Sequence, residues 1–175
     1  TLTDEQIEHA TEYFGSEDLR DDVDEVLITG GDPLMSLKKL KVSLDNIKKH
    51  AENIKIIRIG TRVPFQDPKR INDNLLDLFS GYKNFRFEIG VNVNHPIEFW
   101  EETEEALNKL NKNGIRIYNQ NPLLKGVNDN FNTLVSLYQK LRDNNIEAHY
   151  LFHAIPLAGM DHHRTSLKKG YNLIR

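Results

Sequence analysis

The sequence predicts an α/β domain with a parallel sheet, arranged as a partial (β/α) barrel of about five strand–helix units. Short runs rich in Ile, Val, Leu and Phe alternate with longer segments of helical periodicity. The midpoints of five such runs fall near residues 27, 57, 88, 117 and 149, a repeat close to the length of one strand plus its crossover helix. Even spacing favours a barrel over a doubly wound sheet, although the pattern alone leaves both open.

The predicted strands are β-branched or aromatic runs that end near glycine or polar residues: 25–29, 54–59, 85–91, 115–118 and 146–152. Because several are apolar on both faces, they indicate a parallel sheet covered by helices. The predicted helices have a capping residue at their start and one apolar face: 3–14, 36–47, 74–82, 96–113, 130–144 and a segment from 166 onward.

Composition limits the function classes. The 175 residues carry 23 Lys and Arg against 26 Asp and Glu, for a net charge of −3, which argues against a nucleic-acid-binding protein. The chain shows no apolar run long enough for a membrane span and no signal peptide, so we expect one cytoplasmic domain over residues 1–175 without membrane partners. It also contains no cysteine, which excludes thiolate ligands and a cysteine nucleophile within these residues.

The strand ends predict where a ligand binds. In parallel α/β folds the ligand site lies beyond the carboxyl ends of the strands. Here these ends are followed by glycine or polar residues, namely Thr29-Gly30-Gly31-Asp32, Arg58 with Arg62, Asn92 with Asn94 and His95, Asn119-Gln120-Asn121, and His153. A structural domain has little need for such a rim, so we expect a ligand or active site there.

Each rim group has a possible chemical role and a plainer structural one. Gly30-Gly31 lets the backbone approach a ligand, and Asp32 offers a carboxylate to an ammonium group, yet the same residues make a good tight turn. Arg62 lies where it can bind a carboxylate or phosphate, whereas Arg58 lies within a strand, where an internal ion pair is equally expected. The amides suit an adenine or ribose edge, or ordinary loop hydrogen bonds: Asn92, Asn94, Asn119 and Gln120.

A metal site is the minor interpretation of the histidines. His153, His162 and His163, with Asp161 and His95, include suitable ligand types, but the adjacent pair lacks the spacing of helical zinc sites. We therefore predict no metal ligands here and keep a metal-dependent barrel hydrolase as a remote alternative.

Taken together, the motifs resemble the lysine 2,3-aminomutase family of radical S-adenosylmethionine (radical SAM) enzymes. The similarity runs from about Asp22 to the end of the chain and rests on the ordered set LITGGDPLM, IRIGTRVP, NHP, NQNPLLKGVND and HHRTSLKKG. The resemblance implies a partial barrel that binds a [4Fe–4S] cluster and SAM at the strands' carboxyl ends. It also implies 1,2-migration of an amino group on an amino acid, with a 5′-deoxyadenosyl radical and pyridoxal phosphate (PLP).

Position by position, the resemblance assigns SAM contacts to five residues: Gly30, Gly31, Asp32, Asn92 and Gln120. Gly30-Gly31-Asp32 corresponds to the turn that meets the SAM amino group, and Asn92 replaces a family histidine. Supporting or substrate-side positions are Arg58, Arg62, Asn94, His95, Asn119, His153 and Ile155. No catalytic residue is assigned.

Three departures from the family matter. The CxxxCxxC cluster loop and first strand, which precede the matched segment in the family, are not found in this chain, and neither is the downstream PLP lysine. Ile155 stands where the aminomutases have an aspartate for the substrate ammonium, so lysine is not the expected substrate. We therefore expect an incomplete radical SAM core, inactive alone, from a parent that acts on a small-molecule amino acid substrate. A homo-oligomer is the partner state considered for that parent. The alternative is a cluster-free module that binds SAM or a nucleoside.

Overall fold

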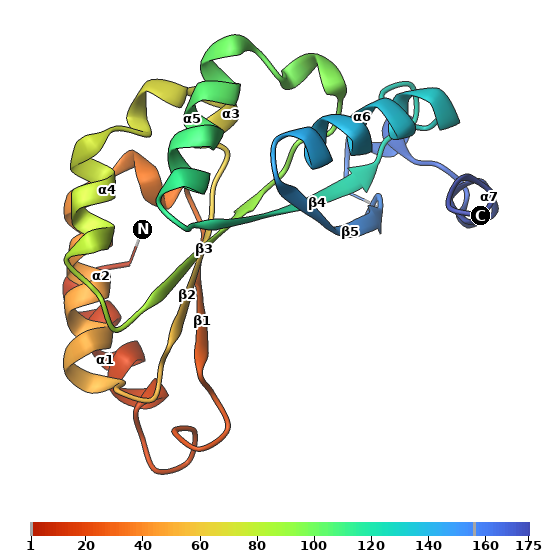
Figure 1. Cartoon of the computed structure of the whole chain (residues 1–175). Helices are drawn as coiled ribbons and strands as arrows, with labels where there is room; N and C mark the ends of the chain where they lie inside the picture. Colours follow the sequence, from red (N-terminus) through yellow and green to blue (C-terminus); the bar gives the residue numbers. More distant parts are fainter. Residues whose placement is uncertain (1, 156) are drawn as a thin grey trace.

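The computed structural model describes residues 2–155 and 157–175 and contains a sheet of five parallel strands in the order β1-β2-β3-β4-β5 (Figure 1). The strands are β1 (Glu25–Ile28), β2 (Ile56–Gly60), β3 (Arg86–Val91), β4 (Arg116–Leu123) and β5 (Ile146–His153). The helices are α1 (Asp4–Phe14), α2 (Leu37–His50), α3 (Val63–Gln66), α4 (Asp73–Ser80), α5 (Glu101–Lys112), α6 (Phe131–Asp143) and α7 (Leu167–Leu173). Strand order equals chain order, as expected for a barrel wound in one direction.

One face of the curved sheet is covered by helices and the other is open. Figure 1 shows α2, α4 and α5 along the same outer side of the sheet, with α1 against α2. The core lies between strands and helices, where Ile57, Ile59 and Ile89 pack with Leu44 and Leu75. Burial of these side chains supplies most of the driving force for this arrangement.

The open, concave face carries the alternate strand residues. The strand register places Leu27, Arg58, Glu88 and Arg116 in one row across β1 to β4. Leu27 remains 54% exposed, because no further layer covers this face in the described residues. The concave face is therefore a mixed surface of charged and apolar side chains.

Two predicted element boundaries are wrong. The strand predicted to end at Tyr118 continues as β4 to Leu123, so its asparagines lie within a strand and not beyond it. The helix predicted over 96–113 is divided into a 3-10 turn (Pro96–Glu98) and α5, because Phe99 and Trp100 adopt extended backbone angles between them. Trp100 is consequently 65% exposed.

Among the described residues, no helix combines the length and the apolar character needed to cross a bilayer.

Candidate functional site

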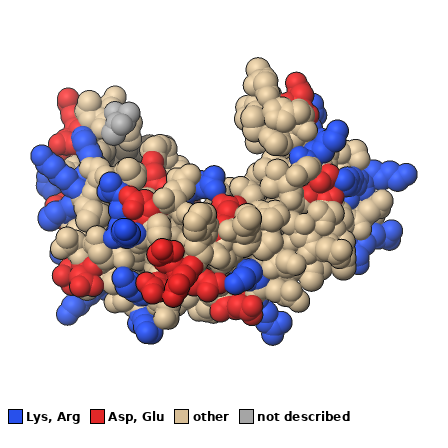
Figure 2. All heavy atoms as spheres, turned by 90° about the horizontal axis from the view of Figure 1, so that it is seen from above, with Lys and Arg blue, Asp and Glu red and all other residues tan. Residues whose placement is uncertain are grey.

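A cavity of about 460 Å³ lies at the carboxyl ends of β1 to β4, a size typical of small-molecule sites. Viewed from above, the molecule is hollowed between two projecting parts, and acidic and basic side chains are intermixed around the hollow (Figure 2). The cavity is lined by Leu27, Thr29, Gly30, Gly31, Asp32, Arg58, Gly60, Thr61, Arg62, Gln66, Gly90, Asn92 and Gln120. Part of the rim predicted from the strand ends therefore lines a cavity: Thr29, Gly30, Gly31, Asp32, Arg58, Arg62, Asn92 and Gln120.

The turn after β1 exposes its backbone to this cavity. Gly30 and Gly31 have φ angles of +86° and +57°, a region that side-chain-bearing residues rarely adopt. A Cβ atom on either glycine would meet no other atom within 4 Å, so the space beside the turn is open. The main-chain groups of this turn can therefore reach a bound molecule directly.

Asp32 holds this turn against the turn after β2. Its Oδ1 accepts hydrogen bonds from the Leu34 N–H at 3.1 Å and the Thr61 hydroxyl at 2.7 Å, and its Oδ2 accepts one from the Arg62 N–H at 2.7 Å. The tight-turn role left open for Asp32 is thus observed, and because its Oδ2 accepts only one hydrogen bond from the protein, the carboxylate keeps acceptor capacity toward the cavity that it lines. Asp32 positions the cavity wall.

A second carboxylate, Glu98, joins the turns after β2 and β3. Its Oε2 accepts a hydrogen bond from the Arg62 guanidinium at 2.8 Å, and its Oε1 accepts from the N–H groups of Asn94 and His95 at 2.7 and 3.0 Å. The Nδ1 atom of His95 in turn accepts from the Ile97 N–H at 3.2 Å, which places the proton of a neutral ring on Nε2. His95 thus caps the 3-10 turn, and Arg62 points its positive charge at Glu98.

Two glycines leave the floor of the cavity bare. Gly60 ends β2 and Gly90 lies beside it in β3. A Cβ on Gly60 would lie 3.1 Å from the Thr29 hydroxyl oxygen, and one on Gly90 would lie 3.9 Å from Gln120 Nε2. The amide of Gln120 therefore lies over Gly90, where it can hydrogen-bond a ligand, and Asn92 adds a second exposed amide to the wall.

Below the cavity, the concave face is closed by an ion-pair network. The Arg58 guanidinium contacts Glu25 at 3.0 Å and Glu88 at 2.9 Å, and Arg86 contacts the other Glu88 oxygen at 3.0 Å. Burial alone would raise the pKa of the Glu88 carboxyl, but its hydrogen bond to Arg58 and the charges of Arg58 and Arg86 hold that pKa below its ordinary value. The alternative of an internal ion pair for Arg58 is thus observed, although part of its side chain still lines the cavity.

The asparagines of β4 do not line the cavity. Asn119 is buried, and its amide donates to the Val93 carbonyl at 3.1 Å and to Asn121 Oδ1 at 3.0 Å, while its oxygen accepts from the Val93 N–H at 2.9 Å. Buried Asn128 continues the chain of contacts by donating to the carbonyls of Asn94 and Pro122, both at 3.0 Å. Of the two roles left open for the Asn119 amide, the structure shows internal hydrogen bonding, because side chains alternate along β4 and Asn119 points to the other face. Asn94 contributes its backbone to this network.

His153 and Ile155, at and after the end of β5, are not among the residues that line this cavity. His153 Nε2 lies 2.8 Å from the Thr165 carbonyl oxygen, and Ile155 is 70% exposed. In the described residues, Asp161, His162 and His163 form no cluster of metal-ligand atoms with His153 or His95. The geometry of the remote hydrolase alternative is therefore not found here.

The sequence analysis did not single out Thr61, Gln66, Glu98 or Asn128. Glu98 carried a detectable signal, because a histidine cap followed three residues later by glutamate is the spacing of a capping box. Asn128 lies within the quoted motif NQNPLLKGVND, but its contacts could not be predicted from the motif, since they join two loops that are distant in sequence. The assembled site offers bare backbone, two amides and two partly neutralised guanidinium groups, a set suited to a small polar molecule with amino, carboxylate or base edges.

Comparisons with known proteins give consistent relatives. The chain is 40% identical to a putative L-lysine 2,3-aminomutase of Aquifex aeolicus over 99% of its length and 37% identical to an L-lysine 2,3-aminomutase of Methanococcus maripaludis over 97%. A glutamate 2,3-aminomutase of Clostridioides difficile is 31% identical over 96% of the chain. The chain spans only 46%, 38% and 39% of these three relatives, respectively. No protein-family model matches it.

Solved structures agree on the fold. A radical SAM methyltransferase from Sphaerobacter thermophilus matches with a TM-score of 0.65 at 17% identity, covering 98% of this chain and 53% of that one. Native anSMEcpe with bound AdoMet and Kp18Cys peptide matches with a TM-score of 0.69 at 13% identity, covering 99% and 50%. These likenesses confirm the predicted fold class, a partial (β/α) barrel of the radical SAM type.

Proposed function

Because this chain is a homologue of the L-lysine 2,3-aminomutases, we propose that it forms the SAM-binding part of a radical SAM enzyme that moves an amino group between adjacent carbons of an amino acid. The observation that carries the proposal is the cavity at the carboxyl ends of β1 to β4, with Gly30-Gly31 on one wall and Gln120 on its floor. These residues occupy the motif positions that the sequence resemblance assigns to SAM.

The residues present fit SAM. In this proposal the backbone of Gly30 and Gly31 receives the amino group, while Asn92 and Gln120 supply amide contacts. Bare glycine surface at Gly60 and Gly90 leaves space that side chains would otherwise fill. When bound and reduced, SAM supplies the carbon-centred radical that starts hydrogen abstraction. The chain itself binds, orients and shields the molecule, with Asp32 and Glu98 holding the walls.

The other two cofactors are proposed to lie outside these residues. A [4Fe–4S] cluster needs thiolate ligands, and the chain has no cysteine. For PLP the proposal rests on the family resemblance, which places the PLP lysine downstream of the matched segment. This fits the fact that the chain spans less than half of its relatives. In that case these 175 residues are the central part of the radical SAM core and are inactive alone.

The substrate is proposed to be a small amino acid other than lysine, bound in the cytoplasm. Ile155 provides no charge for an ε-ammonium group, and the relatives already include a glutamate 2,3-aminomutase. Position 155 follows β5, whose end is on the same rim as the other strand ends.

The test uses the full-length protein that contains this chain, reconstituted anaerobically with iron and sulfide and then reduced with SAM present. Formation of 5′-deoxyadenosine, measured by chromatography, is the expected result. A Gln120→Ala variant should bind SAM about tenfold more weakly, a cost of about 1.4 kcal/mol for one hydrogen-bonding side chain, whereas Gln139→Ala on the exposed surface of α6 serves as the control.

Two results would contradict the proposal. SAM binding without any 5′-deoxyadenosine in the reconstituted full-length protein would favour the cluster-free SAM or nucleoside module. If neither the wild type nor the two variants, Gln120→Ala and Gln139→Ala, bind SAM, the cavity is not a SAM site.

A further inference from the structure

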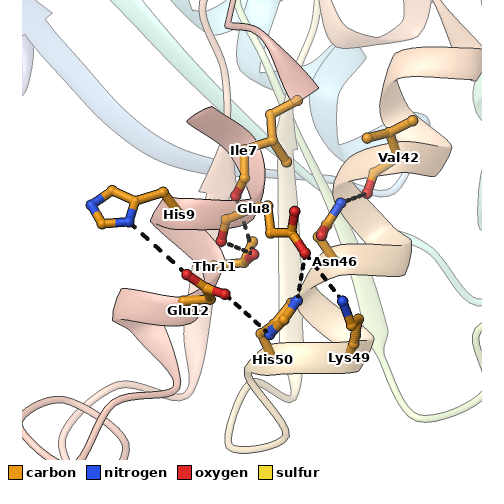
Figure 3. Close-up of polar contacts among 9 residues, drawn as sticks. All are labelled: Ile7, Glu8, His9, Thr11, Glu12, Val42, Asn46, Lys49 and His50. Carbon is orange, nitrogen blue, oxygen red and sulfur yellow. Dashed lines mark hydrogen bonds and ion pairs between the residues drawn. The ribbon is translucent and has the colours of Figure 1, made fainter. Parts of the chain in front are cut away.

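Outside the residues that line the cavity, three potential metal ligands meet where α1 packs against the end of α2. Glu8 and Glu12 lie on α1, and His50 is the last residue of α2. One ligand atom from each of the three lies within 4.8 Å of the others. Figure 3 shows both carboxylates pointing from α1 toward the His50 ring.

The fold holds these groups together in two ways. Residues four apart on a helix lie one above the other, so Glu8 and Glu12 project from the same face of α1. The two helix ends also touch through their backbones, because a Cβ on Gly15 would fall 1.8 Å from the His50 carbonyl oxygen. The spacing between the carboxylates and the imidazole is therefore set by close packing of the two helices.

In the described residues, two further titratable side chains lie beside this cluster, Lys49 and His9. Lys49 Nζ lies 3.1 Å from Glu8 Oε1, and His9 Nδ1 lies 4.0 Å from Glu12 Oε2 with its side chain 89% exposed. The hydrogen bond and charge of Lys49, with a smaller contribution from His50, keep the pKa of the Glu8 carboxyl below its ordinary value. The cluster thus places two carboxylates beside one lysine ammonium group.

We propose that Glu8, Glu12 and His50 form a site for a divalent transition-metal ion of the zinc type, which joins α1 to α2. One imidazole nitrogen with two carboxylates suits zinc, cobalt or manganese better than magnesium or calcium, which prefer oxygen ligands throughout. His50 Nε2 and Glu8 Oε1 are 3.3 Å apart, close to the ~3.3 Å that separates two ligands of a tetrahedral zinc ion. Water completes the coordination.

Two adjustments complete the site. Glu12 Oε1 now lies 3.9 Å from His50 Nδ1, on the other side of the ring from Glu8, so a rotation of the exposed Glu12 side chain brings it to the shared ion. Lys49 Nζ, which now contacts Glu8 Oε1, must move away before this oxygen can bind the ion, so Lys49 competes with the metal. This competition distinguishes a metal site from a simple ion-pair cluster. In an ion-pair cluster, Lys49 and His50 would both stabilise the carboxylates and would not oppose each other.

The experiment compares full-length protein variants after removal of metal with a chelator. Zinc is titrated, and bound zinc is counted by elemental analysis while the melting temperature is recorded with and without the ion. The wild type should hold one zinc per chain more than His50→Gln, and its zinc-dependent rise in melting temperature should exceed that of His50→Gln. At this site, Glu12→Gln should bind at least ~10-fold more weakly, Lys49→Gln more tightly, and His9→Gln like the wild type.

The outcomes are decisive even if one variant is unstable. Melting of each metal-free variant shows whether it folds, and Glu12→Gln, at an exposed position, replaces His50→Gln if the latter does not. Equal zinc content in the wild type, His50→Gln and Glu12→Gln would overturn the proposal, as would weaker binding by Lys49→Gln.

Discussion

At the scale of single residues, two carboxylates hold the turns around the candidate site in place through hydrogen bonds within the protein. Glu98 accepts three hydrogen bonds from two different turns, and Asp32 accepts three from its own turn and the next. Each charged acceptor satisfies backbone N–H groups and fixes Arg62 or Thr61 at the cavity wall. These two residues act as positioning residues.

Substitution of Glu98 tests this role. In Glu98→Gln, one side of the carboxamide donates and faces the Arg62 guanidinium, which can only donate, so Arg62 is released from the wall. We expect SAM affinity of the full-length protein to fall roughly tenfold, which corresponds to about 1.4 kcal/mol. Isothermal titration calorimetry measures this, with Glu102→Gln on the exposed face of α5 as the control. An unchanged affinity would exclude a positioning role for Glu98.

Substrate preference is tested at Ile155. Ile155→Asp restores a carboxylate where the resemblance places the partner of a substrate ammonium group. We expect the ratio of kcat/KM for lysine to that for the natural substrate to rise, because a charged pair replaces an apolar contact. Product formation from each amino acid, followed by chromatography, gives the ratio. If Ile155→Asp leaves it unchanged, position 155 does not select the substrate.

At the scale of elements, charge pairing joins neighbouring strands across the concave face. The Glu88 side chain is 1% exposed and contacts Arg58 of β2 and Arg86 of its own strand, while Arg58 also reaches Glu25 of β1. Removing one member of such a buried pair leaves an uncompensated charge. Glu88→Gln should therefore cost roughly 3 kcal/mol of unfolding free energy, measured by urea denaturation, and exposed Glu147→Gln should cost little.

The same pair predicts how stability depends on pH. The pKa of Glu88 is lower in the folded protein than its ordinary value of 4.5, so the ionised carboxylate stabilises the fold above that value. This contribution is lost as the pH falls through the lower, folded-state pKa. As the pH decreases, the unfolding free energy of the wild type should therefore fall more steeply than that of Glu88→Gln. Parallel curves of unfolding free energy against pH would contradict the lowered pKa of Glu88.

The junction of α1 and α2 makes a second prediction at this scale. In Gly15→Ala, the added Cβ would fall 1.8 Å from the His50 carbonyl oxygen, a backbone atom that moves only with its helix. We expect a loss of at least about 3 kcal/mol in unfolding free energy, detected by thermal or urea denaturation. Gly81→Ala is a matched control, since its Cβ would lie 3.4 Å from the nearest atom at the end of α4. Similar losses for both would argue against close contact between α1 and α2.

At the scale of the whole molecule, the open sheet leaves apolar side chains uncovered. Leu27, Tyr150 and Phe152 are all about half exposed, and the last two pair with Gln120 and Pro122 in the register of β4 and β5. Tyr150 and Phe152 form an exposed aromatic pair on β5, with ring centroids 5.4 Å apart, whereas Leu27 lies at the opposite edge of the sheet. Exposed apolar surface of this kind favours association. We expect these 175 residues, expressed alone, to self-associate with rising concentration in sedimentation velocity. Phe152→Ser should reduce self-association more than Phe131→Ser does, although the Phe131 ring is also exposed, at the start of α6. Equal effects of the two variants would show that self-association does not occur through the concave face.

Sequence patterns predicted the fold well and the site only in part. Periodicity located all five strands because each places β-branched residues against covering helices, as Ile57 and Ile59 do. Proximity to a strand end predicted which residues line the cavity, including Gly30, Gly31 and Gln120. It did not predict which way a side chain points. Asn119 points away from the cavity because β4 continues past its apolar run and side chains alternate along it. Asp32 accepts a hydrogen bond from Thr61, in a turn 29 residues away. Such contacts depend on strand register, which no local pattern encodes.

The strand order has a consequence for how the protein is made. The strands begin at residues 25, 56, 86, 116 and 146, and each pairs with the one before it. During synthesis, every new strand therefore emerges from the ribosome after its docking edge already exists, and no strand waits for a partner encoded far downstream. Loop closure spans about 30 residues at each step, which keeps its entropic cost nearly constant. Such a sheet can grow vectorially, one strand and one helix at a time, as the chain is translated.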